Sequence, residues 1–316
     1  MSYPTSPVED LHQVVPIPVD LDAIDNEPLS PGPELWPPKS TTRSVLHGLG
    51  VVQKYSAYGF CTFLGLHVAS TVIVPILPMV PHEIKQEVFE MARSIYQQVP
   101  LFESVMIIGA AAVHVASGIG IRICRNILKK HKKDTNELRS NFTKALEEPV
   151  IKDDTRDDIG LGGITGILGL GYRKSWISRQ LPGMSPLSFS GYILIPLVAL
   201  HFTKFRYLPI AVGEDSSLVN LDYITYYLNH SKVYLGNALN FGALLLLLWV
   251  MMYHSVSGML RINRKFSMKW KQFGYVVING VTLMGLATMV VFKRAPVDST
   301  GYIGRSFLKY LNHFWF

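Results

Sequence analysis

Five uncharged, apolar stretches constrain the fold of this chain more than any other feature. A bilayer core about 30 Å thick requires about 20 apolar helical residues to cross it. The stretches run between charged residues and cover residues 55–82, 104–121, 180–203, 233–260 and 272–292. Only 17% of the 316 residues are charged, whereas soluble domains carry about 25%. The sequence therefore predicts an all-α membrane protein with five transmembrane helices.

Lys and Arg residues are distributed unevenly between the two sides of the predicted membrane. The N-terminal tail and the loops after the second and fourth spans hold 21 of the 30. Cytosolic segments carry this excess in most membrane proteins, so we expect the N-terminus in the cytosol and the C-terminus across the membrane. The net charge of +7 thus reflects juxtamembrane residues, and no nucleic-acid partner is expected.

Residues 1–38 have the composition of a disordered tail. They contain nine prolines, seven acidic residues and no Lys or Arg. Such a segment buries too little apolar surface to fold, and it lacks the basic residues of secretory and mitochondrial targeting peptides. We therefore expect residues 1–40 to form a disordered, acidic, Pro-rich cytosolic tail.

One apolar island interrupts this tail, with the sequence Val14-Val15-Pro16-Ile17-Pro18-Val19. Prolines on either side of Ile17 favour an extended backbone, and an extended segment can add a strand to the edge of a partner's sheet. The alternative, a chance arrangement within a Pro-rich tail, remains open on composition alone.

The most specific pattern is an internal duplication. Aligning the two halves matches six pairs of residues: His67 with His201, Ser56 with Ser190, Tyr58 with Tyr192, Leu66 with Leu200, Pro75 with Pro209 and Ile76 with Ile210. Units with an even number of spans are expected to be parallel repeats about an axis along the membrane normal. Within a bundle at residues 41–295 we therefore predict two helical hairpins, at residues 55–123 and 187–262, and a fifth helix at residues 272–292.

Each of the first four spans contains one histidine at a depth where ionisable groups are costly, namely His67, His114, His201 and His254. At a rise of about 1.5 Å per residue, His67 and His114 lie about 15 Å from the cytosolic ends of their spans. Such residues usually face the bundle interior. Two interpretations stay open: neutral imidazoles that hydrogen bond to neighbouring helices, or axial ligands of haem iron.

Neighbouring residues favour the haem interpretation. Gly118 and Gly258 lie four residues beyond His114 and His254, on the same helix face, where a missing Cβ admits a flat macrocycle. Arg122 and Arg261 follow at the membrane surface, where a guanidinium suits a propionate. The duplication favours pairing His114 with His254 and His67 with His201. Pairing within each hairpin remains the alternative.

The block from Tyr253 to Arg261 resembles the haem-ligand helix of the succinate dehydrogenase and fumarate reductase membrane anchors. That resemblance implies a cytochrome b-type bundle with haem b and, as the alternative function, membrane electron transfer. In this sequence Arg261 lies one residue further along than in the family pattern, and no second histidine follows it.

Over essentially its full length the chain resembles the fungal mitochondrial outer-membrane family named for MDM-ten-complementing protein one. The resemblance rests on the two histidine blocks, the five spans and the motif at residues 14–18. It implies an adaptor that recruits the lipid transfer protein vacuolar protein sorting thirteen to the mitochondrial outer membrane. Carried over to this tail, Pro16 and Pro18 would anchor the partner, while Val14, Ile17 and Val19 would fill apolar pockets. The same resemblance implies that the protein supports mitochondrial lipid homeostasis, and that its bundle binds phospholipids and scrambles them between the leaflets.

Two shorter segments and the enzyme question complete the sequence-based expectations. Residues 159–172 are too short to span a bilayer and are expected to be interfacial or re-entrant, and the aromatic-rich residues 296–316 suit an interfacial segment. The spans contain no phosphate loop, nucleophile–base motif or paired carboxylates. We therefore expect no metabolic enzyme.

Overall fold

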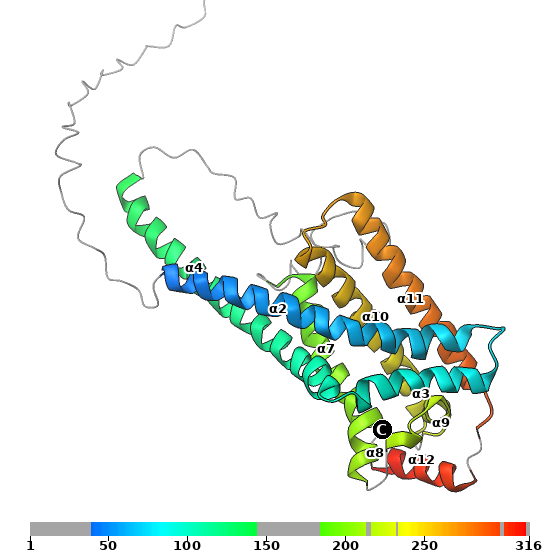
Figure 1. The fold of residues 1–316 in the computed structure, drawn as a ribbon. Helices are drawn as coiled ribbons and strands as arrows, with labels where there is room; N and C mark the ends of the chain where they lie inside the picture. Colours follow the sequence, from blue (N-terminus) through cyan, green and yellow to red (C-terminus); the bar gives the residue numbers. More distant parts are fainter. Residues whose placement is uncertain (1–38, 144–183, 213–215, 232, 298–299, 314–316) are drawn as a thin grey trace, which may run out of the picture.

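The computed structural model confirms the all-α, five-span prediction. It describes residues 39–143, 184–212, 216–231, 233–297 and 300–313. Within these ranges five helical segments are long and apolar enough to cross a membrane. They are Ser40–Ile76, Phe102–Lys130, Pro186–Ala211, Gly236–Ile262 and Met268–Arg294. Figure 1 shows them packed side by side as a helical bundle.

The first two spans are longer than the charge pattern predicts. Helix α2 (Lys39–Val68) starts well before Lys54, and helix α4 (Ala110–Thr143) continues far past Arg122. The two helices pack along each other and extend together beyond the other spans (Figure 1). Their close approach depends on Gly120, because a Cβ at that position would lie 3.0 Å from Leu49 Cδ1.

The remaining three spans pack against each other and against the first span. Helix α7 (Pro186–Phe202) packs on α10 (Gly236–Ile262), and α11 (Met268–Arg294) packs on α10 and on the end of the first span. The last contact includes a buried hydrogen bond in which Thr288 Oγ1 donates to the Val72 carbonyl at 2.6 Å. The fifth helix is therefore held between the two hairpins.

The first and third spans share a local departure from α-helical geometry. A π-helical segment follows His67 at η1 (Ala69–Ile73), and another follows His201 at η5 (Thr203–Tyr207). Each segment is followed by a fully buried proline, Pro75 or Pro209. A proline ring clashes with the carbonyl four residues earlier in a regular α-helix, so a wider turn before it relieves the clash.

Three short helices, which we call the cap, cover the end of the bundle opposite the start of α2 (Figure 1). They are α3 (His82–Gln98), α9 (Leu221–Asn229) and α12 (Tyr302–Asn312). The cap and the adjoining ends of the spans share one aromatic core, with Tyr223, Phe307 and Tyr310 almost completely buried. Residues 296–316 were expected to be interfacial. Within this segment Phe307 and Tyr310 pack against α9, and Tyr302 and Leu308 are exposed, so the interfacial position stays a prediction.

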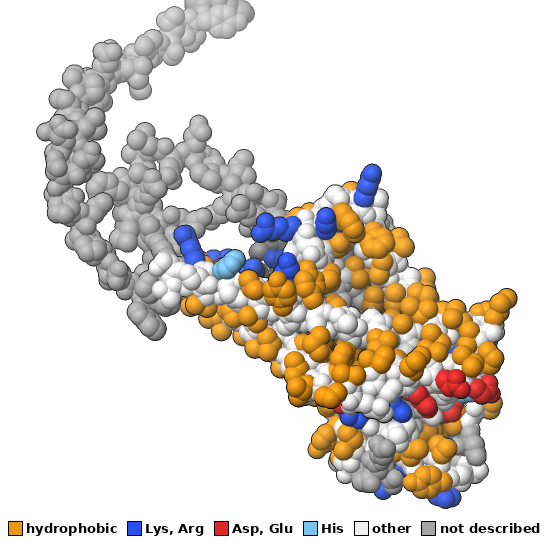
Figure 2. Space-filling view, in the orientation of Figure 1, with side chains coloured by type: hydrophobic (Ala, Val, Ile, Leu, Met, Phe, Trp, Pro, Cys, Tyr) orange, Lys and Arg blue, Asp and Glu red, His pale blue; other side chains and the backbone are white. Residues whose placement is uncertain are grey.

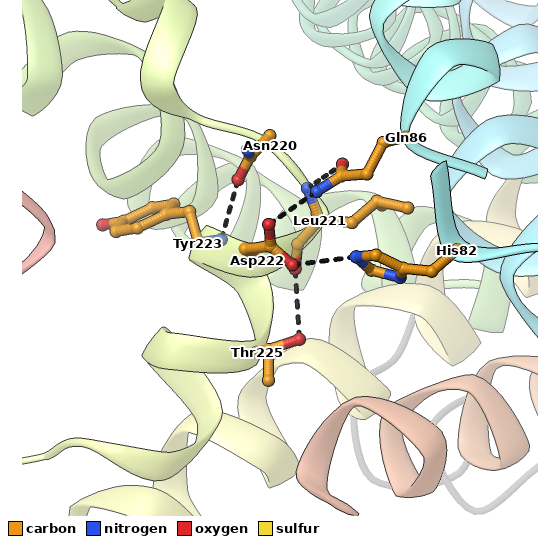
Figure 3. A network of polar contacts seen from close by, with 7 residues as sticks. All are labelled: His82, Gln86, Asn220, Leu221, Asp222, Tyr223 and Thr225. Carbon is orange, nitrogen blue, oxygen red and sulfur yellow. Dashed lines mark hydrogen bonds and ion pairs between the residues drawn. The ribbon is translucent and has the colours of Figure 1, made fainter. Parts of the chain in front are cut away.

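A polar network joins the cap helices that come from different loops (Figure 3). Asp222 accepts a hydrogen bond from Gln86 Nε2 at 2.8 Å, and its other oxygen lies 3.1 Å from His82 Nε2. Gln86 Oε1 also accepts the Leu221 N–H at 3.0 Å, and Asn220 caps the start of α9. Because every partner is satisfied across the α3–α9 contact, the network fixes these two helices relative to each other.

Candidate functional site

The four membrane histidines meet in two pairs, each made across the two hairpins. The ring centroids of His67 and His201 lie 6.0 Å apart, and those of His114 and His254 lie 6.1 Å apart. The first pair joins α2 to α7, and the second joins α4 to α10. Of the two arrangements left open by the sequence, the structure places the rings according to the pairing across hairpins.

Hydrogen bonds define the protonation of the His114–His254 pair. His114 Nδ1 lies 3.3 Å from the Gln53 carbonyl, which is only an acceptor. His254 Nδ1 lies 3.1 Å from Ser190 Oγ, and that hydroxyl already donates its proton to the Leu187 carbonyl at 2.8 Å. The Gln53 carbonyl therefore holds the His114 proton on Nδ1, and Ser190 Oγ does the same for His254 while its own proton points to the Leu187 carbonyl. This tautomer leaves the Nε2 lone pair of each ring available as an acceptor or metal ligand.

The same arrangement occurs at equivalent positions of the two repeats. Ser56 Oγ donates to the Gln53 carbonyl at 3.1 Å, as Ser190 Oγ donates to the Leu187 carbonyl. The alignment that matches Ser56 with Ser190 also places Gln53 opposite Leu187. Each hairpin thus orients the histidine of its second helix with the same turn of its first helix.

The His67–His201 pair lies in an aromatic environment instead. His67 stacks on Phe63 with centroids 5.3 Å apart and meets Tyr96 edge-on at 6.3 Å. His201 contacts Phe205 at 4.9 Å. The Nδ1 atoms of both histidines are buried and have no hydrogen-bond partner among the described residues. The two pairs are therefore chemically different, and only His114 and His254 have the Nδ1 acceptors that orient metal-binding imidazoles.

The glycines and arginines predicted from the sequence occupy different surroundings. A Cβ on Gly118 would lie 3.1 Å from the Gln53 side-chain nitrogen, so the glycine lets α2 pack close to α4 at this position. A Cβ on Gly258 would have no neighbour within 4 Å. Arg122 lies over the Tyr192 ring, 5.8 Å from its centroid, and joins α4 to α7. Arg261 is exposed at the end of α10.

Sequence reasoning missed Gln53 and Gly191 as residues of this site. A Cβ on Gly191 would lie 3.0 Å from His254 Cε1, so the imidazole occupies the space left by this glycine. Gly191 lies between Ser190 and Tyr192, which are two of the matched positions of the duplication. That position is the signal that could have identified it. Gln53 acts through its backbone carbonyl, which any residue provides, and so carried no signal.

The spacing of the His114–His254 pair fits one metal ion between the rings. Metal–imidazole bonds are about 2 Å long and a ring nitrogen lies about 1 Å from its centroid, so two rings that share an ion have centroids about 6 Å apart. The observed 6.1 Å separation agrees with this distance, and it equally matches the ordinary edge-to-face contact that the two rings make at an interplanar angle of 89°. The open space beside Gly258 lies one helical turn from His254.

Two regions with sequence-based expectations lie outside the described residues. They are the tail with its motif from Val14 to Val19, and residues 159–172. The interpretation of Pro16, Ile17 and Pro18 as partner-binding residues therefore remains a prediction.

Comparisons with known proteins agree with a chain that spans a membrane. The sequence model of the family described as MDM10-complementing protein 1, transmembrane domain, matches residues 62–176 and 196–305. These two segments begin as far apart as His67 and His201. The chain is also 26% identical over 293 residues to the mitochondrial adapter protein MCP1 of Saccharomyces cerevisiae (strain ATCC 204508 / S288c), with 89% of each chain covered. No solved structure matches. The family model covers more than half of the sequence, and the chain therefore belongs to the MDM10-complementing protein 1 transmembrane-domain family.

Proposed function

We propose that this protein is a mitochondrial outer-membrane adaptor with a cytosolic N-terminus, which recruits a bridge-like lipid transfer protein. The observation that carries the proposal is the match over 89% of both chains to a yeast protein named as a mitochondrial adapter. The positive-inside distribution of Lys and Arg supports a cytosolic tail. The tail would act as the recruitment handle, and the bundle as its anchor.

The motif at residues 14–19 provides the partner-binding chemistry of this proposal. Pro16 and Pro18 keep the segment extended, so that Val14, Ile17 and Val19 can enter apolar pockets along a sheet edge of vacuolar protein sorting thirteen. A short linear motif in a tail of this composition binds reversibly, because ordering the tail offsets part of the binding energy.

The recruitment test uses yeast cells that lack their own adapter and express a fluorescent vacuolar protein sorting thirteen. We expect the wild-type chain to bring the fluorescence to mitochondria, and Pro16→Ala with Pro18→Ala to abolish this recruitment. The tail contains a second Pro-x-Pro sequence, Pro31-Gly32-Pro33, without the apolar flanks. Substituting Pro31 and Pro33 by Ala is the matched control and should leave recruitment intact. Equal recruitment by both double variants would refute the motif assignment.

The bundle gives this adaptor a second role in the proposal, namely phospholipid scrambling. Lipid delivered to one leaflet must reach the other, and polar side chains lie at mid-depth between the hairpins, including His67 and His201. The test is dithionite quenching of a fluorescent phospholipid in vesicles that contain the purified chain. Scrambling allows the whole pool of label to be quenched, whereas protein-free vesicles retain about half.

Haem binding is a second candidate function, favoured by the Nδ1 protonation and spacing of His114 and His254. These two residues would hold a haem b, which would supply one-electron chemistry. Gln53 and Ser190 would hold the imidazoles in the ligand tautomer. The family and the yeast relative are named for complementation and adapter roles, so membrane electron transfer itself has no support from the comparisons.

The haem candidate is tested by absorbance of the detergent-purified chain, oxidised and reduced with dithionite, from cells supplied with excess haem. We expect sharp reduced α and β bands that are lost in His114→Ala. They should shift or weaken in Ser190→Ala, which removes the Nδ1 acceptor of His254. A flat wild-type spectrum would refute haem binding and leave the histidines as residues of helix packing.

A further inference from the structure

A groove between α10 and α11 is not used by the proposed function. It has a volume of about 360 Å³, within the range of ligand sites. It lies between the last two turns of α10 and the first turns of α11, near the tip where these helices meet (Figure 1). Its lining consists of Ser255, Val256, Met259, Leu260, Asn263, Lys265, Trp270, Phe273 and Val277.

The walls of the groove are apolar and belong to the last two candidate spans. Val256 and Leu260 come from the last turns of the fourth span, and Phe273 and Val277 come from the first turns of the fifth. Phe273 has 57% of its surface exposed. Within a bilayer, such a surface is covered by hydrocarbon, and the volume of the groove has room for part of one acyl chain.

The rim of the groove is rich in basic residues. Residues 261–271 include five Lys or Arg residues and no Asp or Glu, and Figure 2 shows basic side chains gathered at this end of the molecule. Lys265 Nζ lies 5.5 Å from the centroid of the Trp270 ring. Trp at the membrane–water interface and Lys beside it are typical of headgroup level.

The position of Lys265 is fixed by the end of α10. The Lys265 N–H donates to the Leu260 carbonyl at 2.9 Å, and Arg264 has a φ of 54°. A hydrogen bond from the sixth residue back to the first, with the fifth residue in the left-handed conformation, is a Schellman motif. Asn263 also accepts a hydrogen bond from Tyr58 OH of α2 at 2.8 Å. The cationic rim is therefore built by the fold and attached to the first span.

We propose that this groove binds an anionic glycerophospholipid of the leaflet on the N-terminal side. One acyl chain lies between Val256 and Val277, and the phosphate and anionic headgroup contact Lys265 and Lys269. The charge of the rim selects an anionic lipid, and the apolar groove selects a lipid over a soluble phosphate. This site does not depend on the recruitment motif or on scrambling.

The test is quenching of Trp270 fluorescence by lipids brominated on the acyl chain. The full chain, with Trp36, Trp176, Trp249 and Trp315 replaced by Phe, is reconstituted in dioleoylphosphatidylcholine vesicles with increasing amounts of brominated phosphatidylserine or brominated phosphatidylcholine. We expect half-maximal quenching at about a tenfold lower fraction of brominated phosphatidylserine, because two lysines face its headgroup.

Two variants separate a bound lipid from general surface attraction. Lys265→Gln with Lys269→Gln should remove the preference for phosphatidylserine, and Val277→Phe, which fills the groove, should weaken quenching by both lipids. Lys129→Gln with Lys130→Gln is the control, since it removes the same charge from α4 and should keep the preference. Equal half-maximal fractions for the two lipids, or a loss of preference in the control as well, would overturn the proposal.

A second measurement covers the case in which the single-Trp chain does not fold. Native mass spectrometry of the wild-type chain in detergent, with equal amounts of added phosphatidylserine and phosphatidylcholine, should retain phosphatidylserine preferentially. The same adduct should be lost in the Lys265 and Lys269 double variant. Equal retention of the two lipids by the wild-type chain would overturn the proposal as well.

Discussion

Phe307→Ala is expected to release helix α12 from the cap while the five spans remain folded. Phe307 is 0% exposed, and its ring lies 5.2 Å from Tyr223 and 5.5 Å from Tyr226, measured between centroids. Truncation of a buried Phe to Ala costs about 3–5 kcal/mol. Since about 1.4 kcal/mol corresponds to a tenfold change, the opening equilibrium of α12 should rise by a factor of about one hundred to a few thousand.

Amide hydrogen exchange of the chain in nanodiscs, followed by mass spectrometry, measures this opening directly. Peptides that cover Tyr302–Asn312 should exchange at least a hundredfold faster in Phe307→Ala, and peptides from α10 should be unchanged. Leu308 is the next residue on the same helix and is 42% exposed, so Leu308→Ala should change exchange by less than about threefold. Similar exchange in the two variants would refute the assignment of Phe307 to the cap core.

Three further predictions concern other parts of the fold. Arg206→Gln should lower the thermal unfolding midpoint, because it leaves the partly buried Glu103 carboxylate without the two 2.6 Å hydrogen bonds from Arg206. Adding Glu103→Gln to this variant should recover part of the lost stability. Gly191→Ala should lower the unfolding midpoint, because the new Cβ would lie 3.0 Å from Cε1 of His254. Gly65→Ala, whose Cβ would meet nothing within 4 Å, should leave the midpoint unchanged. Equal midpoints for the two variants would contradict the predicted contact. Burial raises the pKa of Tyr96 to about 12. Because the unfolded chain loses this proton near pH 10, the stability of the folded chain should fall above about pH 10. The absorbance titration at 295 nm of the wild-type chain minus that of Tyr96→Phe measures this ionisation, and a midpoint near pH 10 would contradict the prediction.

The spans could be predicted from the sequence because transfer into a bilayer dominates their energetics. Long uncharged stretches such as residues 233–260 have no alternative in lipid to a continuous helix, since every backbone group must be satisfied internally. The histidines could be located for the same reason, because a titratable residue within such a stretch is exceptional. Their partners across the hairpins depend on tertiary packing, and the sequence left two arrangements open.

The cap could not be predicted, because its helices are short and carry charges. Helix α3 contains Glu83, Glu87 and Glu90 on its exposed surface, so hydropathy assigns it to a loop. Its helical structure depends on burying Phe89 in a core shared with α9 and α12, and that core is assembled from three separate loops. The extension of α2 before Lys54 was missed for a related reason, since charge ends an apolar stretch but does not end a helix.

The composition of the cap core has a consequence for how the protein is made. The aromatic rings of α9 are translated and inserted about eighty residues before Phe307 and Tyr310, which cover them. With five spans, all of these residues lie on the side opposite the N-terminal tail. Tyr223 and Tyr226 therefore remain uncovered until the last segment has crossed the membrane, and a chain that ends after Arg294 leaves them exposed. Folding of the cap should therefore finish only after α12 has been made, and a bulky group fused next to α12 would interfere with this step.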